Sequence, residues 1–255
     1  MRLLRQAGVS PQGGNALQYN VEGGYVSEMI GLDARPQVLP VRGSRHRASD
    51  ALHSALVSTT EGPTLHTTRL ALRRWHAADR APFARLNADP QVMRHFLRPL
   101  DGAESDALVD RIEATFETHG YGLWAVERLG DGAFLGFTGL AVPRFTAAFT
   151  PCVEVGWRFA REAWGYGYAT EAARAALRFG FEEAGLPEIV TFTSVGHERS
   201  RRVMERLDMH RDPADDFDHP SFPVGHPLRR HVLYRLTAAE HGAKTARGER
   251  GRSPS

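Results

Sequence analysis

The chain is poor in several residue types whose abundance would define a class of protein. Among its 255 residues there is one cysteine, Cys152, and one lysine, Lys244. A single cysteine excludes an intrachain disulfide and a four-cysteine zinc site, and it is usual in a reducing compartment. No run approaches the roughly 18 apolar residues that a bilayer-spanning helix needs, and no apolar stretch of a secretory signal follows the first arginines. We therefore expect a cytoplasmic protein that does not enter a membrane.

Arginine carries almost all of the positive charge. Thirty-two basic side chains oppose 30 acidic ones, which leaves a formal net charge of +2. This balance argues against nucleic acid as a partner, because bulk electrostatic attraction would be weak. The arginine bias runs through every segment and fits a GC-rich coding sequence. Only a local cluster of guanidinium groups would indicate phosphate binding, for which the planar fork is well suited.

Composition divides the chain into a folded stretch and two tails. Residues 1–63 contain frequent Gly, Ser, Gln and Arg and keep no helix or strand period, so we expect them to be mostly disordered or weakly ordered. Residues 238–255 are polar and lack aromatic side chains, which predicts a disordered tail. The hydrophobic content of 42% is ordinary for a globular protein. We therefore place one folded domain at residues 64–237.

Residues 64–237 alternate between strand and helix signals. Leu108, Ile112 and Phe116 recur at four-residue spacing on one helical face, and Gly120 is placed to end that helix with a left-handed cap. The tripeptide GDG at 130–132 predicts a hairpin turn. Strands are expected at 68–75, 121–129, 132–142, 152–160, 185–195 and 229–236, and helices from about 78, over 104–120, over 167–184 and over 198–207. This order is that of an α+β (mixed α/β) fold.

The stretch 153–176, VEVGWRFAREAWGYGYATEAARAA, carries the strongest functional pattern. A strand leads into a loop with Gly165 and Gly167, and then into a helix whose first N–H groups have no partner within the helix. Those N–H groups and the helix dipole suit an anion such as a pyrophosphate. Without a ligand the same pattern is a tight strand-to-helix turn. It is neither a dinucleotide GxGxxG fingerprint nor a Walker loop.

This segment resembles motif A of the GNAT superfamily of N-acetyltransferases, and more narrowly its RimJ/RimL-like branch. The family pattern Gln/Arg-x-x-Gly-x-Gly/Ala maps onto residues 164–169, with Trp in the first place. The stretch TSVGHERSRRVMERLDM resembles motif B, and the whole resemblance is collinear over about residues 64–237. It implies the GNAT fold, a central, mostly antiparallel sheet with a splayed parallel strand pair, flanked by helices.

The resemblance also implies that acetyl-CoA binds in a cleft between strands 152–158 and 188–195. Two positions depart from the family pattern. His197 replaces the usual Asn and can still donate a hydrogen bond to the pantetheine arm, and Asp208 replaces a helix-ending Gly, where Asp tolerates a left-handed conformation. The residues that the resemblance assigns to CoA binding are Trp157, Trp164, Gly165, Tyr166, Gly167, Tyr168, Ala169, Thr170, His197 and Ser200.

Acetyl transfer to an amine defines the roles to be filled. The attacking amine must lose a proton, for which a carboxylate acting directly or through water can serve as base. Glu154 on the strand before the loop is our first candidate, with an exposed or salt-bridged strand residue as the alternative. The backbone N–H of Trp157 or of a neighbouring residue could polarise the thioester carbonyl. Many family members protonate the thiolate with a Tyr where this chain has Met204, so the resemblance makes Ser200 the candidate donor. The alternative is that Ser200 is a helix-surface or N-terminal capping residue.

Other reactive residues have simpler interpretations. Cys152 lies in a predicted strand with no convincing base beside it, and we interpret it as a small buried hydrophobic residue. Asp216, Asp218, His219 and His226 lie close together in sequence, but Pro-rich loops use such residues as hydrogen-bond anchors, and we expect no metal. Arg199 and Arg202 lie near the expected cofactor, either as phosphate contacts or as a solvated helix face. The aromatic side chains that could line an acceptor pocket, or simply belong to the core, are Trp75, Phe96, Trp124 and Phe145.

Together these features predict an acetyl-CoA-dependent N-acetyltransferase. The acceptor would be a primary amine, on a small molecule or at a protein N-terminus, that attacks directly in a ternary complex. The alternative is a non-catalytic module that binds or senses acyl-CoA, which the substitutions at His197 and Met204 leave open. The protein would be a monomer or homodimer.

Overall fold

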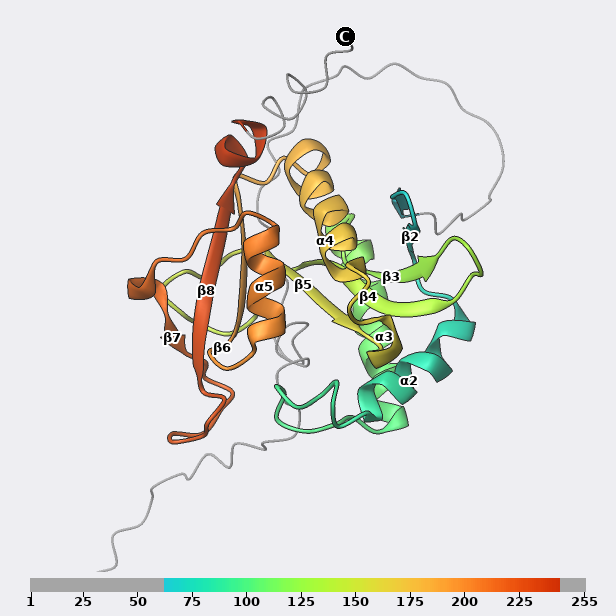
Figure 1. Ribbon diagram of the computed structural model, residues 1–255, viewed down its shortest axis with the longest axis horizontal. Coiled ribbons are helices and arrows are strands. Elements are labelled where there is room, and N and C mark those ends of the chain that lie inside the picture. Colours follow the sequence, from blue (N-terminus) through green and yellow to red (C-terminus); the bar gives the residue numbers. More distant parts are fainter. Residues whose placement is uncertain (1–61, 244–255) are drawn as a thin grey trace, which may run out of the picture.

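The computed structural model describes residues 62–243, and the expectations for residues 1–61 and 244–255 fall outside them. Figure 1 shows a central sheet whose strands run from the N-terminal hairpin to the C-terminal strand, with helices on both faces. The strands are β1 (Leu65–His66), β2 (Leu70–Arg73), β3 (Leu123–Arg128), β4 (Phe134–Ala141), β5 (Glu154–Phe159), β6 (Glu188–Ser194), β7 (Phe217–Asp218) and β8 (Arg230–Thr237). The α-helices are α2 (Arg80–Ala88), α3 (Gly102–His119), α4 (Tyr168–Arg178) and α5 (Glu198–Arg206).

The eight strands form one sheet in the order β1-β2-β3-β4-β5-β6-β8-β7. All neighbouring pairs are antiparallel except β5 and β6, which run parallel. The arrangement confirms the predicted GNAT fold class. It adds two short strands, β1 and β7, which the sequence pattern did not mark because each is only two residues long.

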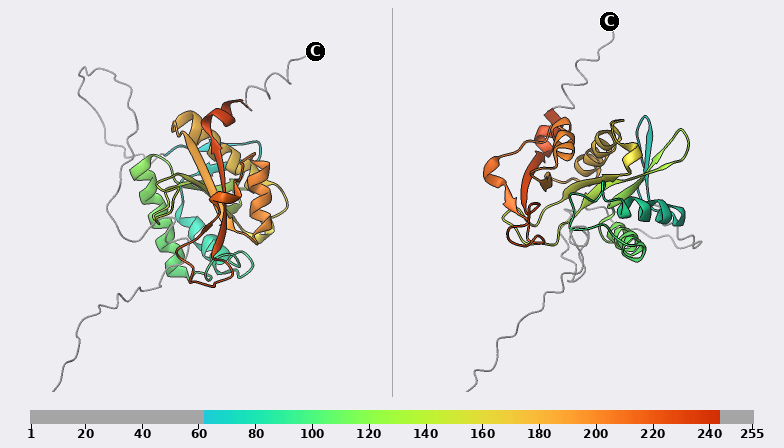
Figure 2. Two further views of the ribbon diagram at one scale, coloured as in Figure 1. Left: turned by 90° about the vertical axis from the view of Figure 1, so that its left-hand side faces the viewer. Right: turned by 60° about the horizontal axis from the view of Figure 1, so that its bottom comes forward.

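The helices cover the sheet in two layers. Helices α2 and α3 pack together on one face, while α4 lies against β4 and β5 on the other, beside α5 (Figure 2). The core between the layers includes Trp124, Phe83 and Phe137, all essentially inaccessible to solvent. Trp75 is also buried, and its indole N–H donates to the carbonyl of Leu123 at 2.7 Å. Trp75 and Trp124 are therefore core residues rather than part of an acceptor pocket.

Local sequence rules explain where the helices end. Asp101 caps α3 by accepting a hydrogen bond from the N–H of Glu104, and Gly120 ends the helix with a φ of 73°, as its position in the sequence predicted. The expected helix 167–184 ends its regular part at Arg178 and continues as a wider turn over Phe179–Glu183. Asp208 has a φ of 60°, which confirms the left-handed conformation expected there.

The first residues of the predicted C-terminal tail are ordered. Residues 238–243 are helical, whereas we expected a disordered tail from 238. The helix is capped by Thr237, whose N–H donates to the Glu240 carboxylate at 2.9 Å and whose hydroxyl accepts from the Glu240 N–H. This reciprocal pattern is a capping box, and it stabilises a helix start even in a polar sequence.

Candidate active site

The two parallel strands of the sheet, β5 and β6, meet in a seam with little pairing. The two strands share one paired position, Glu154 opposite Val190, where the N–H of Val190 donates to the carbonyl of Val153 at 2.9 Å. Because backbone groups alternate along a strand, the N–H and C=O of Val155 and Trp157 point toward β6 as well. Beyond the single pair the strands separate. We infer from this register that the N–H of Trp157 faces the seam without a backbone partner among the described residues.

A glycine loop follows β5 at the open end of the seam. Gly165 and Gly167 have φ values of 87° and 81°, conformations that L side chains rarely adopt. A side-chain methyl at Gly165 would meet nothing within 4 Å, so backbone conformation and not crowding requires this glycine. The indole N–H of Trp164 donates to the carbonyl of Phe159 at 2.9 Å and ties the loop back to the strand.

Helix α4 begins immediately after this loop. Its first internal hydrogen bond runs from the N–H of Glu171 to the carbonyl of Gly167, so the N–H groups of Tyr168, Ala169 and Thr170 have no partner within the helix. The Tyr166 ring is 61% exposed at the loop and stacks on Tyr168, with ring centroids 5.7 Å apart. The structure thus brings the expected loop residues 164–170 together around an outward-facing helix N-terminus that favours an anion.

Glu154 lies at the closed end of the seam. It is 2% exposed, and its Oε2 atom has no hydrogen-bond partner among the described residues. Burial raises the pKa of the Glu154 carboxyl well above its usual range. The side chain is not exposed and forms no salt bridge with any described residue, so the alternative of an exposed or salt-bridged strand residue is wrong. Burying a carboxyl whose Oε2 atom lacks a partner is costly, and such groups are common at functional sites.

Two histidines stack at the opposite end of the seam. His197 begins α5 as its N-cap residue, and its ring lies on that of His95, with centroids 3.9 Å apart and planes inclined by 14°. Nδ1 of His197 lies 3.0 Å from the Thr193 hydroxyl, and Nδ1 of His95 lies 3.2 Å from the Ser194 hydroxyl. Burial, reinforced by His95 and nearby arginines, lowers the pKa of His197 to about 3, so the ring is neutral at pH 7.

Ser200 lies in the first turn of α5. It is buried, and because His197 occupies the N-cap position, Ser200 is not the capping residue. Met204, one turn further along, is fully buried and carries no donor. Ser200 thus remains a hydroxyl at the start of the helix that borders β6. Its capping alternative is removed, and its proposed role as a hydrogen-bond donor stays a prediction.

The two arginines of α5 that we considered as phosphate contacts, Arg199 and Arg202, both interact with other side chains. Arg199 lies over the Trp164 ring at 4.5 Å from the centroid, and Arg202 pairs with Glu198 at 3.2 Å. Arg199 therefore packs on the first residue of the expected CoA loop, whereas Arg202 is neutralised within its own helix. Of these two candidate phosphate contacts, only Arg199 lies against the loop.

The remaining reactive candidates are accounted for by their surroundings. Burial, with the nearby Glu154 carboxyl, raises the pKa of Cys152 to about 12, which keeps its thiol protonated and unreactive. Asp216 pairs with Arg211, and Asp218 pairs with Arg229 at 3.3 Å. Across residues 62–243 there is no group of three or more His, Cys, Asp or Glu side chains arranged to hold a metal ion. In the same range no helix has the length and apolar character needed to cross a bilayer.

Sequence reasoning missed His95 and a buried polar chain behind β5. Arg158 donates from Nη1 to Asn87 at 2.6 Å, and Asn87 donates to Ser105 at 2.9 Å, which links the strand to α2 and α3. The Arg158 guanidinium lies 4.2 Å from the centroid of the Phe96 ring. For the buried polar chain, the only signal in the sequence was an arginine, Arg158, within a predicted strand. For His95 the sequence held no signal, because its partner Ser194 is 99 residues away.

Comparison with known proteins places this geometry among acetyltransferases. Residues 69–210 match the family described as acetyltransferase (GNAT) domain. YkkB of Bacillus subtilis, described as uncharacterized, is 36% identical over 147 residues, which cover 57% of this chain and 84% of YkkB. The FsC-acetyl coenzyme A-N(2)-transacetylase of Aspergillus fumigatus is 34% identical over 151 residues, which cover 56% of this chain and 63% of that protein.

Solved structures share the same fold. An acetyltransferase from Agrobacterium tumefaciens aligns with a TM-score of 0.56 and 26% identity, over 74% of this chain and 99% of that one. A structure described as a ribosomal-protein-serine acetyltransferase from Vibrio cholerae aligns with a TM-score of 0.54 and 15% identity, over 70% of this chain and 99% of that one. At 15% identity, the similarity to the Vibrio cholerae structure shows a shared fold and does not assign the chain to the RimJ/RimL-like branch.

Proposed function

The chain belongs to the GNAT acetyltransferase family, and from this premise we propose that it transfers an acetyl group from acetyl-CoA to a primary amine. One observation carries the proposal: the glycine loop and the unpartnered Glu154 carboxyl lie along the same open seam between β5 and β6. The glycine loop fits the anionic end of acetyl-CoA, and the Glu154 carboxyl would supply a base where β5 and β6 meet.

The seam and loop fit the parts of acetyl-CoA in order. The pyrophosphate would accept hydrogen bonds from the N–H groups of residues 166–170, with the hydroxyl of Thr170 in reach of the same anion. The pantetheine arm would extend along β5 and replace the missing strand pairing with its own amides. The neutral ring of His197 borders this path and takes the place of the family's Asn as a donor. The acetyl carbonyl would then approach the N–H of Trp157, which stabilises negative charge developing on its oxygen.

Glu154 would remove the proton that the attacking amine must lose. The amine nitrogen forms the new C–N bond, the C–S bond breaks, and the proton passes to the carboxylate directly or through a water molecule. A carboxylate whose pKa is raised by burial holds a proton more firmly than an ordinary glutamate, and is therefore a stronger base once ionised. Ser200 would donate a hydrogen bond to the departing thiolate.

The acceptor would approach from the face of the sheet that carries α2 and α3. The face of β5 that carries Glu154 also carries Arg158, which packs against Phe96 on the loop after α2. Phe145 and Phe149 are half-buried beside Phe192 of β6. This face is mostly apolar and aromatic, so it fits the neutral form of an amine better than a charged one. A small molecule or a protein N-terminus would satisfy these conditions, and the name of the Aspergillus relative is compatible with a small-molecule amine.

Thiol release from acetyl-CoA in the presence of a panel of amines and peptides tests the proposal. Release that requires both an acceptor and Glu154 is the expected result. The second candidate, a module that binds acyl-CoA without turnover, predicts calorimetric binding of acetyl-CoA but no thiol release with any acceptor. If wild-type protein binds neither acetyl-CoA nor CoA, both functions are wrong.

A further inference from the structure

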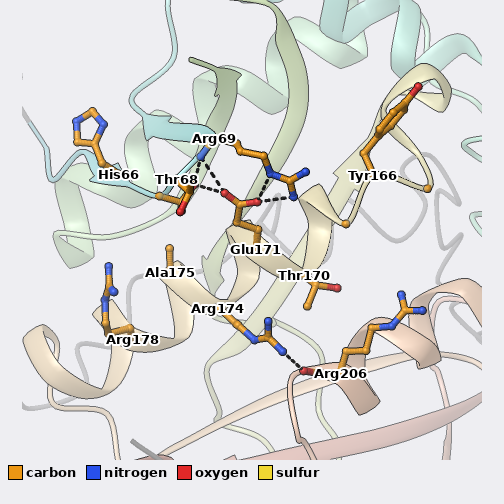
Figure 3. A pocket seen from close by; sticks show the side chains of 13 residues that line it. His66, Thr68, Arg69, Tyr166, Thr170, Glu171, Arg174, Ala175, Arg178 and Arg206 are labelled. Carbon is orange, nitrogen blue, oxygen red and sulfur yellow. Dashed lines mark hydrogen bonds and ion pairs between the residues drawn. The ribbon is translucent and has the colours of Figure 1, made fainter. Parts of the chain in front are cut away.

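The loop between α2 and α3 contacts both strands of the seam, on the face of the sheet opposite α4. The hollow beside the glycine loop and α4 lies on the other face and belongs to the donor end of the seam (Figure 3). Within residues 89–101, the Phe96 ring packs on the Arg158 guanidinium of β5. Its neighbour His95 lies against β6, with Nδ1 3.2 Å from the Ser194 hydroxyl. Two consecutive residues thus hold the loop to one strand each.

The stack of His95 on His197 crosses the end of β6. Thr193 and Ser194 are consecutive residues of that strand, so their side chains point to opposite faces of the sheet. The Thr193 hydroxyl bonds to Nδ1 of His197, and the Ser194 hydroxyl bonds to Nδ1 of His95. The two rings are therefore anchored from opposite faces, and they meet nearly parallel with centroids 3.9 Å apart.

Each ring has one nitrogen engaged and one nitrogen available. Neither Nε2 atom, of His95 or of His197, has a hydrogen-bond partner among residues 62–243. His95 covers one side of the His197 ring, so the stack and the bond to Thr193 together fix the plane of that ring and the direction of its Nε2. If the Thr193 hydroxyl donates to Nδ1, the proton of a neutral His197 lies on Nε2.

The charges around the stack disfavour a protonated imidazole. Burial is the main cause that lowers the pKa of His197 to about 3, and His95, Arg94 and Arg199 act in the same direction. Burial and Arg94 also lower the pKa of His95. Arg94 belongs to the loop and Arg199 to α5, and no carboxylate in the described part of the chain is bonded to either ring. His197 is therefore neutral at pH 7, with a single N–H to donate.

We propose that His95 is a positioning residue for His197, holding that ring so that its Nε2 donates a hydrogen bond to a carbonyl oxygen of the pantetheine arm. This inference rests on the proposed function, in which His197 borders the path of the arm. An asparagine amide carries two N–H groups, whereas a neutral imidazole carries one, on either of two nitrogens. An imidazole in the place of the family's Asn therefore needs its tautomer and its plane fixed, and the stack supplies that constraint.

The ring nitrogens of His197 give the direct test. In protein labelled with ¹⁵N-histidine, two-bond ¹H–¹⁵N spectra show which nitrogen carries the proton, and His197→Ala identifies the signals. Wild-type His197 should be neutral at pH 7 and protonated on Nε2. His95→Leu keeps the bulk of the side chain but not its flat ring, so both tautomers should appear and the pKa of His197 should rise as its burial decreases. A wild-type His197 protonated on Nδ1 would overturn the proposal without any variant.

Calorimetric titration with acetyl-CoA measures the effect of this constraint on donor binding. His95→Leu should bind acetyl-CoA about 5-fold more weakly than wild type, the effect of one hydrogen bond. His95→Phe keeps a flat ring on His197 and should retain most of the wild-type affinity. His119→Leu is the matched control, because His119 is also a half-buried histidine stacked on a ring, that of Tyr121, at the end of α3. Its affinity should equal that of wild type.

A double-mutant cycle separates positioning from direct contact with the donor. If His95 acts through His197, His95→Leu should have no further effect on affinity in a His197→Ala background. Additive losses would show that His95 acts on its own and would overturn the proposal, as would equal losses in His95→Leu and His95→Phe. Wild-type protein that binds neither acetyl-CoA nor CoA would instead contradict the proposed function. The tautomer of His197 in wild type and in His95→Leu would then decide whether His95 positions this ring.

Discussion

Two sites in this domain differ in whether a buried charged side chain has hydrogen-bond partners. Beside β2 and β3, one half-buried arginine is fully paired: Arg73 pairs with Asp79 at 2.7 Å and with Glu127 at 2.8 Å. At the seam between β5 and β6, Glu154 is more deeply buried than Glu127, yet its Oε2 atom has no hydrogen-bond partner within residues 62–243. Closed ion-pair networks hold elements together, whereas an unsatisfied buried group at the seam carries a cost that folding alone does not explain.

The sheet itself shows the same difference. β3 and β4 pair over five positions and β6 and β8 over seven, but β5 and β6 pair at one. Strands that pair along their length contribute stability, while the open seam leaves backbone groups to a ligand. Substitutions in one region or the other should therefore change stability and activity separately.

The largest effect is expected from a charge placed in the glycine loop. Gly167→Glu should abolish measurable CoA binding, with a loss of more than about 100-fold, because it brings a carboxylate beside the pyrophosphate and removes the left-handed glycine at the helix start. Gly167→Ala is the control for backbone strain alone and should lose clearly less affinity. Calorimetry measures both. Equal affinities for Gly167→Glu and wild type would remove the loop from the CoA site.

The next largest effect is expected from the buried carboxyl of the seam. Glu154→Gln should lower kcat by about 10²- to 10³-fold, in the range of general base catalysis, while the affinity for acetyl-CoA stays near that of wild type. The variant should also lose the ascending limb of the pH–kcat profile that reports ionisation of this group. An unchanged profile would show that another group takes the proton.

The same variant tests the cost of burying Glu154. Burial raises its pKa in the folded state, so the folded protein binds the proton more tightly than the unfolded chain does. The free energy of unfolding of wild type should therefore fall as pH rises above about 4.3, the pKa of an unperturbed glutamate, until the folded-state pKa is passed. Glu154→Gln does not titrate, so it should be more stable than wild type at pH 8. Denaturant unfolding at several pH values measures the difference.

At the Arg73–Asp79 pair we expect a substitution to lower stability and to leave kcat unchanged. Asp79→Asn should lower the free energy of unfolding by about 2–4 kcal/mol, because it removes the buried partner of Arg73. It should leave kcat of the folded enzyme unchanged, since the pair lies away from the seam. Asp110→Asn breaks the exposed pair with Arg80 and should cost less than about 1 kcal/mol. A fall in kcat for Asp79→Asn at a temperature where the variant is folded would contradict the division into two regions.

The sequence predicted those features that depend on neighbouring residues. The spacing of Leu108, Ile112 and Phe116 and the cap at Gly120 are local, and all four behave as predicted. The glycine loop could be found because a strand, two glycines and a helix follow one another within the chain. The α-helix from residue 167 was expected to run further than it does, because periodicity does not register the wider turn that follows Arg178.

Features that depend on distant residues could not be predicted. The contact of His95 with Ser194 and the pairing of Arg69 with Glu171 join residues about 100 positions apart, and no spacing rule reports them. Arginine clusters in sequence were also a poor guide to free guanidinium groups. Arg202 is adjacent to other arginines and is paired, whereas Arg174 stands alone in the sequence and has no acidic partner in the folded region.

The smallest effect is expected at the hydroxyl that borders the seam. Ser200→Ala should lower kcat by about 3- to 10-fold with little change in the KM for acetyl-CoA, because one hydrogen bond to the departing thiolate is worth about 1 kcal/mol. Ser200 is buried and does not cap its helix, so stability should change by less than it would at a capping position. Steady-state kinetics and thermal unfolding of the same preparation separate the two effects. A variant with wild-type kcat would assign thiolate stabilisation elsewhere, and one with reduced stability but unchanged kcat would place Ser200 with the structural residues.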